Sequence, residues 1–329
     1  MPTCSIPALR AKAPKAMPAT SRRRFLAISA AMGVAASPVR AATPLVTWRG
    51  QALGAEASIT LAHPDRAAAQ RLLAACTAEI ARLEAIFSLY RADSAVSRLN
   101  AQGALGAPPI ELVEILGRCA AFSELTAGAF DVTVQPLFRR YAEHFARASA
   151  DPAGPAVDDV LGLVDWRGVR LDPGRVSFAR PGMAITLNGV AQGYITDRVA
   201  DRLRAAGMTD VLVDLGELRA LGRHPDGRPW RSGIARPGGG DLVSAVDMAD
   251  TALAVSCGAG SPFEASGRCN HLLDPATGRC ADPARLVVVL AQDATTADAL
   301  ATAFALVPEE RARTIAAKLP SVHPSFLTA

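Results

Sequence analysis

The stretch Asn188-Gly-Val-Ala-Gln-Gly-Tyr194 contains two glycines and passes into a helical pattern that ends at Gly207. An apolar run, Val211-Leu-Val-Asp-Leu215, follows and is typical of a buried strand. Further along, the residues Arg285–Ala291 form the most apolar strand pattern of the chain. Strands and helices alternate without a regular strand–helix–strand rhythm, which predicts an α+β protein with mixed, largely antiparallel sheets packed against helices.

Three further helices are predicted, two before this stretch in the sequence and one after it. Apolar residues recur every three or four positions over 65–88, and a second helix is predicted from 110 to about 126, after a Pro-Pro pair. Residues 296–306 are predicted to form a third helix, capped by Thr295 or Thr296.

The charge of the chain is unevenly distributed. The 329 residues carry a formal net charge of +4, but residues 1–41 hold seven Lys or Arg and no Asp or Glu, so the rest has 28 basic against 31 acidic groups. A nucleic-acid binder needs clustered excess basic charge, so this composition argues against a nucleic-acid partner. No apolar run reaches the roughly 18–20 residues of a membrane span.

Residues 1–41 have the pattern of an export signal. Arg22, Arg23 and Arg24 precede an apolar run over 25–36, and Val39-Arg40-Ala41 has small residues where a signal peptidase cleaves. The paired arginines resemble a twin-arginine signal, and an ordinary Sec signal is the alternative. We expect cleavage of 1–41, export to a bacterial periplasm and a single folded unit over 42–329.

The cysteines after the leader have no C-x-x-C spacing, which argues against a zinc site. Cys76 and Cys119 fall on apolar faces of predicted helices and are expected to pack as small hydrophobic groups. Cys269 and Cys280 are close in sequence, and whether they form a disulfide stays open.

Three segments combine glycine, hydroxyl, imidazole and acidic groups. The turn 188–194 presents backbone N–H groups at a helix start, which suits a phosphate. Asp298 and Thr302 share one helix face, and their oxygens with a backbone carbonyl suit Mg²⁺. His271 and Asp274 flank a turn where either side chain could accept a proton. Each segment alone also has a plain structural explanation: a glycine turn, a helix-end carboxylate, a packed histidine.

A fourth pair of segments places Tyr90 and Phe130 beside turns. Their rings could stack on a planar ligand or pack in the core. Together, the four features resemble the ApbE family of FAD:protein FMN transferases, from about residue 48 to 306. The matching segments are 53–55, 87–100, 128–133, 188–194 with Asp197, 215–222, 271–278 and 297–302.

The resemblance implies a single T-fold-like catalytic unit and a Mg²⁺-dependent transferase. Such an enzyme moves the FMN part of FAD onto a Ser or Thr hydroxyl of an acceptor flavoprotein and releases AMP. The implied metal ligands are Asp298, Thr302 and the backbone carbonyl of Gly189, and His271 would lie near the reacting phosphates with Asp274 as the other candidate base. The implied FAD site consists of Leu53, Tyr90, Ala129, Phe130, Asp131, Thr186, Gln192 and Leu272.

Three of these positions depart from the family pattern. Leu53 stands where methionine is common, Thr186 replaces an aspartate, and Gln192 replaces a lysine that would neutralise phosphate charge. Two alternatives to transfer follow: an FAD-binding assembly factor without transfer chemistry, and Mg²⁺-dependent hydrolysis of FAD to FMN and AMP.

Overall fold

The computed structural model describes residues 26–27, 43–147, 149–237, 239 and 242–328. Its centre is a seven-stranded sheet built from β2 (Leu45–Ala52), β3 (Ala55–Ala62), β7 (Val211–Asp214), β8 (Leu218–Leu221), β11 (Ala252–Cys257), β12 (Arg285–Ala291) and β13 (His323–Thr328). The strand order is β13-β12-β11-β8-β7-β3-β2, and every neighbouring pair is antiparallel. The predicted α+β fold with antiparallel sheets is confirmed.

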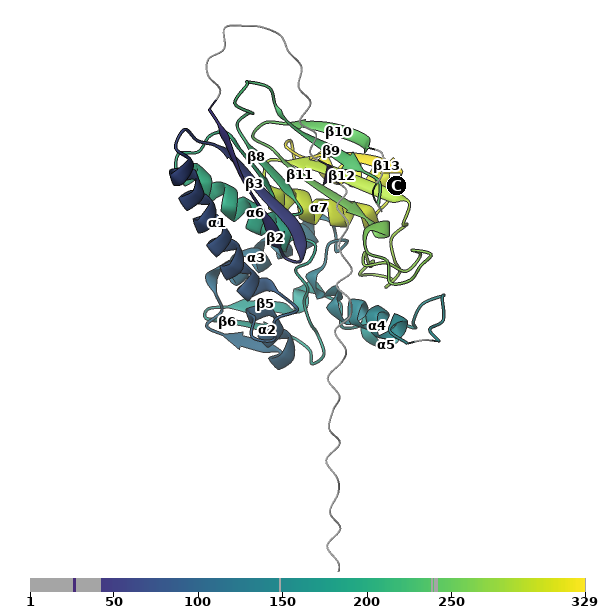
Figure 1. Ribbon diagram of the computed structural model, residues 1–329. Coiled ribbons are helices and arrows are strands. Elements are labelled where there is room, and N and C mark those ends of the chain that lie inside the picture. Colours follow the sequence, from purple (N-terminus) through teal and green to yellow (C-terminus); the bar gives the residue numbers. More distant parts are fainter. Residues whose placement is uncertain (1–25, 28–42, 148, 238, 240–241, 329) are drawn as a thin grey trace, which may run out of the picture.

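Eight α-helices occur in the described residues: α1 (Arg66–Phe87), α2 (Ala95–Gln102), α3 (Ile110–Leu125), α4 (Gln135–Phe145), α5 (Asp158–Leu161), α6 (Ala191–Ala205), α7 (Ala294–Leu306) and α8 (Glu309–Ala316). The helices α1, α6 and α7 cover one face of the large sheet (Figure 1). A three-stranded sheet, β1 (Leu26–Ala27), β9 (Trp230–Ala235) and β10 (Leu242–Met248), lies on the opposite side.

The large sheet has an apolar core on each face, one shared with the helices and one shared with β9 and β10. In β12, Val287 and Val289 pack with the helices, whereas Leu286 and Val288 pack with the residues of β9 and β10. A strand that is buried on both faces must be apolar at successive positions, which explains why this segment has no alternation.

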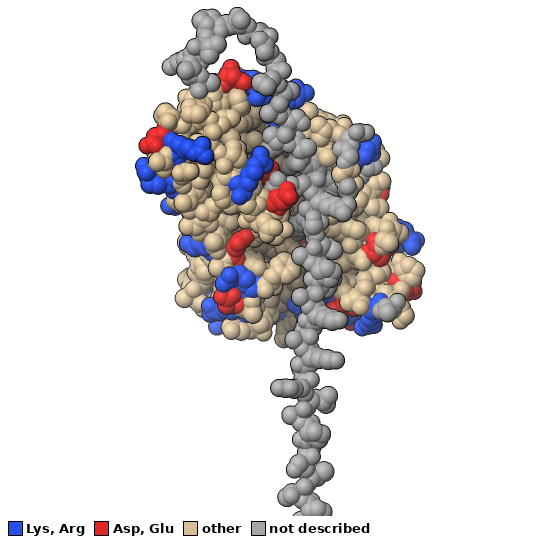
Figure 2. Space-filling view, viewed as in Figure 1, with Lys and Arg blue, Asp and Glu red and all other residues tan. Residues whose placement is uncertain are grey.

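A smaller sheet completes the fold. It has the order β4-β6-β5, with β4 (Ala104–Gly106), β5 (Val169–Asp172) and β6 (Arg175–Phe178), and lies with α2, α4 and α5 below the large sheet in Figure 1. On the face shown in Figure 2, basic and acidic side chains are interspersed in small groups. No helix of the described residues is long and apolar enough to cross a membrane.

The helix predictions hold at α1 and α3 but not at the start of α7. Asp65 caps α1, which ends before Ser88. The helix α7 begins at Ala294, and its N-cap is Asp293, whose carboxylate accepts a hydrogen bond from Thr296 N at 2.9 Å. The predicted cap at Thr295 or Thr296 is therefore wrong, because the aspartate just before them reaches the free N–H groups first.

The cysteines behave largely as the sequence indicates. Cys76 and Cys119 are buried on α1 and α3, and burial raises the pKa of Cys76 to about 11. Cys269 and Cys280 are free thiols rather than a disulfide in this structure. The predicted export signal over 1–41 lies outside the described residues, apart from 26–27.

Candidate active site

The glycine turn before α6 lies directly against α7. A Cβ on Gly189 would stand 2.9 Å from Thr302 Oγ1, and a Cβ on Gly193 would stand 2.3 Å from the carbonyl oxygen of Ala294. Since real Cβ atoms do not approach that closely, glycine at position 193 lets α6 come up against the backbone of α7, and glycine at position 189 leaves room for the Thr302 side chain. The structure thereby brings Gly189, Asp298 and Thr302 together from segments more than a hundred residues apart.

Asp298 joins the two helices at this corner. It is 5% exposed, and its Oδ2 accepts a hydrogen bond from Gly193 N, in the first turn of α6, at 3.1 Å. The carboxylate therefore faces the positive end of the α6 dipole. Thr302 lies one turn later and next to Gly189, whose carbonyl is the third predicted ligand. All three donors are oxygens, which is the chemistry that a hard cation takes. No group of three or more His, Cys, Asp or Glu suited to a metal occurs in the described residues.

The position of Asp298 depends on a second carboxylate, Asp197 of α6. Its Oδ1 accepts hydrogen bonds from Ala294 N at 2.8 Å and from Arg219 Nη1 at 3.0 Å. Its Oδ2 accepts from Thr295 N at 2.8 Å and Thr295 Oγ1 at 2.6 Å. Burial raises the pKa of Asp197, and the hydrogen bonds from Thr295 oppose that rise. Asp197 thus ties the start of α7 to α6 one turn before Asp298.

Replacing Asp197 with asparagine should destabilise this junction. An amide cannot supply four acceptor positions, and the buried Arg219 guanidinium would lose its counter-charge. We expect the free energy of unfolding to fall by about 3 kcal/mol, measured by denaturant titration. Asp201→Asn, an exposed carboxylate on the same helix, is the matched control, with a change within about 0.5 kcal/mol. A loss below about 1 kcal/mol at Asp197 would contradict this role.

His271 and Asp274 lie on one hairpin, and the carboxylate of Asp274 is engaged within it. Asp274 Oδ1 accepts a hydrogen bond from Ala276 N at 2.9 Å, and Oδ2 accepts one from Thr277 Oγ1 at 2.8 Å. Its carboxylate therefore closes its own turn. His271 is half-buried, and its main-chain N–H donates to the Ser261 carbonyl at 3.1 Å. Because the Asp274 carboxylate is engaged in its own turn, we take His271 as the candidate proton acceptor.

Leu53 and Tyr90, two of the predicted FAD residues, gather near the C-terminal end of α1. Leu53 (φ 49°) and Gly54 (φ 76°) form the two-residue turn between β2 and β3, and the Leu53 N–H donates to the Glu84 carboxylate of α1. Tyr90 follows α1 in a loop and is 89% exposed. An exposed tyrosine ring is available for stacking on a ligand.

The predicted segment Ala129-Phe130-Asp131 points largely into the protein. The Phe130 ring is buried edge-on against Phe122, with 6.0 Å between ring centroids. Asp131 accepts hydrogen bonds from Thr133 N and Oγ1 and from Trp166 N, at 2.7, 2.6 and 2.9 Å. Burial raises the pKa of this carboxyl. Phe130 and Asp131 therefore shape the turn, and the half-buried Ala129 is its more accessible part.

The remaining predicted FAD residues differ in burial. Thr186 is half-buried, and its N–H donates to the Val132 carbonyl at 2.8 Å. The loop that carries Thr186 therefore lies beside the residue that follows Asp131. Gln192 is buried, and its Nε2 donates to the Leu215 carbonyl at 3.2 Å. A Cβ on Gly216 would lie 2.3 Å from that nitrogen, so the amide fills the space beside the turn after β7. Leu272 is buried next to His271.

Asn100 is a positioning residue to which the sequence analysis assigns no role. Its Nδ2 donates to the Ile185 carbonyl and its Oδ1 accepts from Ile185 N, both at 2.8 Å. This pair of bonds holds the loop that carries Thr186. The available signal at Asp197 is an acidic side chain among apolar residues of the helical pattern that ends at Gly207, whereas Asn100 is marked only by its place in the segment 87–100.

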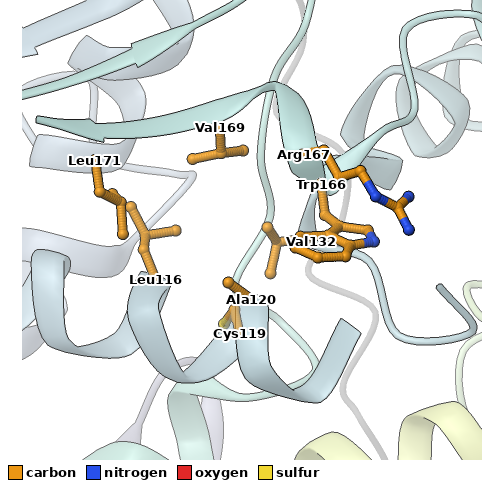
Figure 3. Close-up of a pocket in the computed structure, with 8 residues that line it drawn as sticks. All are labelled: Leu116, Cys119, Ala120, Val132, Trp166, Arg167, Val169 and Leu171. Atoms are coloured by element: carbon orange, nitrogen blue, oxygen red, sulfur yellow. The ribbon is translucent and has the colours of Figure 1, made fainter. Parts of the chain in front are cut away.

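A cavity of about 250 Å³ lies between α3 and β5 (Figure 3). Its walls are mostly apolar and include Leu116, Cys119, Val132, Trp166 and Leu171. None of the predicted site residues lines it, and its volume is below that of pockets which enclose drug-sized ligands. This cavity is too small to be a site for a dinucleotide.

Comparisons with known proteins identify the family of this chain. The ApbE family model matches residues 53–326. The FAD:protein FMN transferase of Treponema pallidum is 31% identical over 268 residues, which cover 74% of this chain and 73% of that protein. The FAD:protein FMN transferase of Vibrio cholerae is 30% identical over 237 residues, covering 70% and 71%.

Solved structures show the same fold. The flavin transferase ApbE from Vibrio cholerae superposes with a TM-score of 0.74 and 27% identity, covering 87% of this chain and 94% of that chain. The ApbE protein from Thermotoga maritima gives a TM-score of 0.75 at 27% identity, with the same coverage. From the family model that matches residues 53–326, the relatives and the shared fold, the chain belongs to the ApbE family.

Proposed function

We propose that this chain is a transferase that moves the FMN part of FAD onto a Ser or Thr hydroxyl of an acceptor protein. The relatives bear the name FAD:protein FMN transferase, and the family match spans every predicted site residue. The observation that carries the proposal is the meeting of Gly189, Asp298 and Thr302 at the start of α6. Phosphoryl transfer depends mainly on positioning and charge neutralisation, which such a corner supplies.

The donor set supports Mg²⁺ as the cofactor. The Gly189 carbonyl, the Asp298 carboxylate and the Thr302 hydroxyl would hold the ion, and the lack of a side chain at Gly189 leaves its backbone next to Thr302 Oγ1. When bound, Mg²⁺ supplies positive charge that neutralises the phosphates of FAD. A buried Gln192 in place of a lysine leaves more of this task to the ion.

The chain's own groups account for the other parts of the reaction. The acceptor hydroxyl oxygen attacks the phosphorus of the FMN half, the bond to the bridging oxygen breaks, and AMP leaves. The hydroxyl proton passes to the imidazole of His271. Backbone N–H groups at the start of α6 orient the phosphates, and the exposed Tyr90 ring stacks on the flavin.

His271 and Asp274 can be separated by mutation. His271→Ala should lower kcat by about 10²–10⁴-fold and flatten the rise of rate with pH, because the proton acceptor is lost. Asp274→Asn should lower kcat less than about tenfold, since its carboxylate closes a turn. Rates from pH 5 to 9 with a fixed acceptor measure both effects. The assignment fails if Asp274→Asn gives the larger loss or if His271→Ala keeps the pH profile.

We also propose that the enzyme works in the periplasm as residues 42–329, after removal of the export signal over 1–41. The basic and apolar pattern of that segment supports the proposal, as does the acidic balance of the remaining chain. The acceptor would then be an exported or membrane-bound flavoprotein that presents a Ser or Thr hydroxyl on that side of the membrane.

Product stoichiometry tests the proposed reaction against its alternatives. The mature protein is incubated with FAD, Mg²⁺ and an acceptor bearing a Ser/Thr flavinylation motif, and AMP and protein-bound flavin are counted. We expect one AMP for each flavin bound to the acceptor and little AMP without acceptor. Equal AMP release without acceptor would mean FAD hydrolysis, and bound FAD with no AMP would mean a binding protein.

A further inference from the structure

Cys269 and Cys280 lie on the two arms of the hairpin that carries His271. Cys280 pairs with Leu273 across the hairpin, and Ala281 N donates to the Leu272 carbonyl at 2.8 Å. The sulfur of Cys280 is 3.2 Å from Asn270 N and 3.4 Å from Asn270 O. The Cys280 side chain therefore reaches back to the residue that follows Cys269, and Cys280 packs against the apolar cluster that contains Cys269.

Neighbouring elements hold this thiol pair in place. Cys269 packs with Tyr141 of α4, Leu137 and Leu273 in a separate apolar cluster that Phe263 and Cys280 adjoin. A Cβ on Gly154 would lie 3.3 Å from Cys269 Sγ, so the connection after α4 covers the sulfur closely. The Tyr141 hydroxyl donates to the Gly278 carbonyl at 3.0 Å and fixes the hairpin against α4.

The surroundings of the pair favour bond formation over other thiol chemistry. Burial raises the pKa of both thiols, that of Cys269 to about 11. Scarce thiolate makes either sulfur a poor catalytic nucleophile. Because the reduced pair is not stabilised as thiolate, a disulfide oxidant shifts it toward the disulfide, which a strong dithiol reductant can reverse. Cys280 is the more exposed residue of the two and its sulfur receives the Asn270 N–H, so we expect it to react first.

We propose that Cys269 and Cys280 are a reversible redox pair that closes to a disulfide and clamps the hairpin carrying His271. The oxidant is a protein or small-molecule disulfide. The Cys280 thiolate attacks one of its sulfurs and releases the other as a thiol; the Cys269 thiolate then attacks the mixed disulfide and releases the second thiol. The pair loses two electrons and two protons, and the outside disulfide becomes two thiols. This inference stands independently of the proposed FMN transfer.

Oxidation of the purified mature protein with oxidised glutathione tests the pair directly. After unfolding and alkylation, mass spectrometry should find the peptides of Cys269 and Cys280 joined, with Cys76, Cys119 and Cys257 alkylated. The Tm should rise by roughly 5 °C, because the bond closes a loop of about a dozen residues. Amide exchange over 270–281 should slow, and dithiothreitol should reverse all three changes.

Three variants make the result specific. Cys269→Ser and Cys280→Ser should lose the cross-link and the gain in Tm. Cys257→Ala is the matched control, since its thiol lies near the Pro283 carbonyl and outside the pair, and it should keep both. Recovery of Cys269 and Cys280 as two alkylated thiols, or as two separate glutathione adducts, would overturn the proposal. A cross-link without slower exchange over 270–281 would overturn the clamp.

Discussion

Asp298→Asn should lower kcat/KM for FMN transfer by on the order of 10³-fold. Asparagine keeps an oxygen that can accept the Gly193 N–H, so the α6–α7 corner should stay folded. The substitution removes the negative charge that would hold the cation beside Thr302. Initial rates over a range of Mg²⁺ concentrations, with circular dichroism as the folding control, measure the effect.

Companion variants separate loss of the ion from general damage. Thr302→Ala should lower kcat/KM about 10–100-fold, and excess Mg²⁺ should recover part of that loss, because only one of the three proposed ligands would be missing. Removing the metal with a chelator should bring wild type to the level of Asp298→Asn. Asp201→Asn, on the exposed side of α6, should retain full activity. Near-normal transfer by Asp298→Asn would show that the corner is not the metal site.

Gly193→Ala should cause the largest loss of stability among single methyl additions at this site. The new Cβ would stand 2.3 Å from the Ala294 carbonyl oxygen and 2.9 Å from Asp298 Cβ, so α7 must move away from α6. Overpacking of this kind costs about 3 kcal/mol, which corresponds to a fall in Tm of roughly 6–9 °C. Displacement of Asp298 should also lower kcat by about 10²-fold. Calorimetry and initial rates measure the two effects.

Gly117→Ala is the matched control for this substitution. Gly117 is an exposed position inside α3, and a Cβ there would meet no atom within 4 Å. Alanine should raise stability by about 0.5–1 kcal/mol, because glycine is a poor residue inside a helix. If Gly193→Ala were as well tolerated as Gly117→Ala, the two helices would not meet at Gly193 as described.

Local patterns were enough to predict the elements that have one strong signal each. The helix α1 has a regular apolar face and an aspartate cap, and β12 is apolar throughout because both of its faces are buried. The helix α4 has only 11 residues, with Pro136 in its first turn, and it was not predicted from the sequence. Its stability comes from packing of Leu137 and Tyr141 against distant residues, which no local window contains.

In the candidate site, too, some features could be predicted from the sequence and others depend on contacts between distant segments. The resemblance to a family identifies Gly189, Asp298 and Thr302, but their meeting depends on contacts between α6 and α7 that only the fold supplies. The interior role of Asp131 was equally hidden, because its partners include Trp166, 35 residues away. Burial and hydrogen-bond partners, rather than residue type, separate side chains that face a ligand from those that hold a turn.

The intact mass of an acceptor protein tests the central claim most directly. The acceptor is incubated with FAD, Mg²⁺ and either wild type or Asp298→Asn, and a second acceptor carries alanine at the modified Ser or Thr. Wild type should add the mass of one FMN residue to the first acceptor alone, and Asp298→Asn should add none in the same time. An unmodified acceptor with wild-type enzyme, or equal modification by Asp298→Asn, would contradict the account.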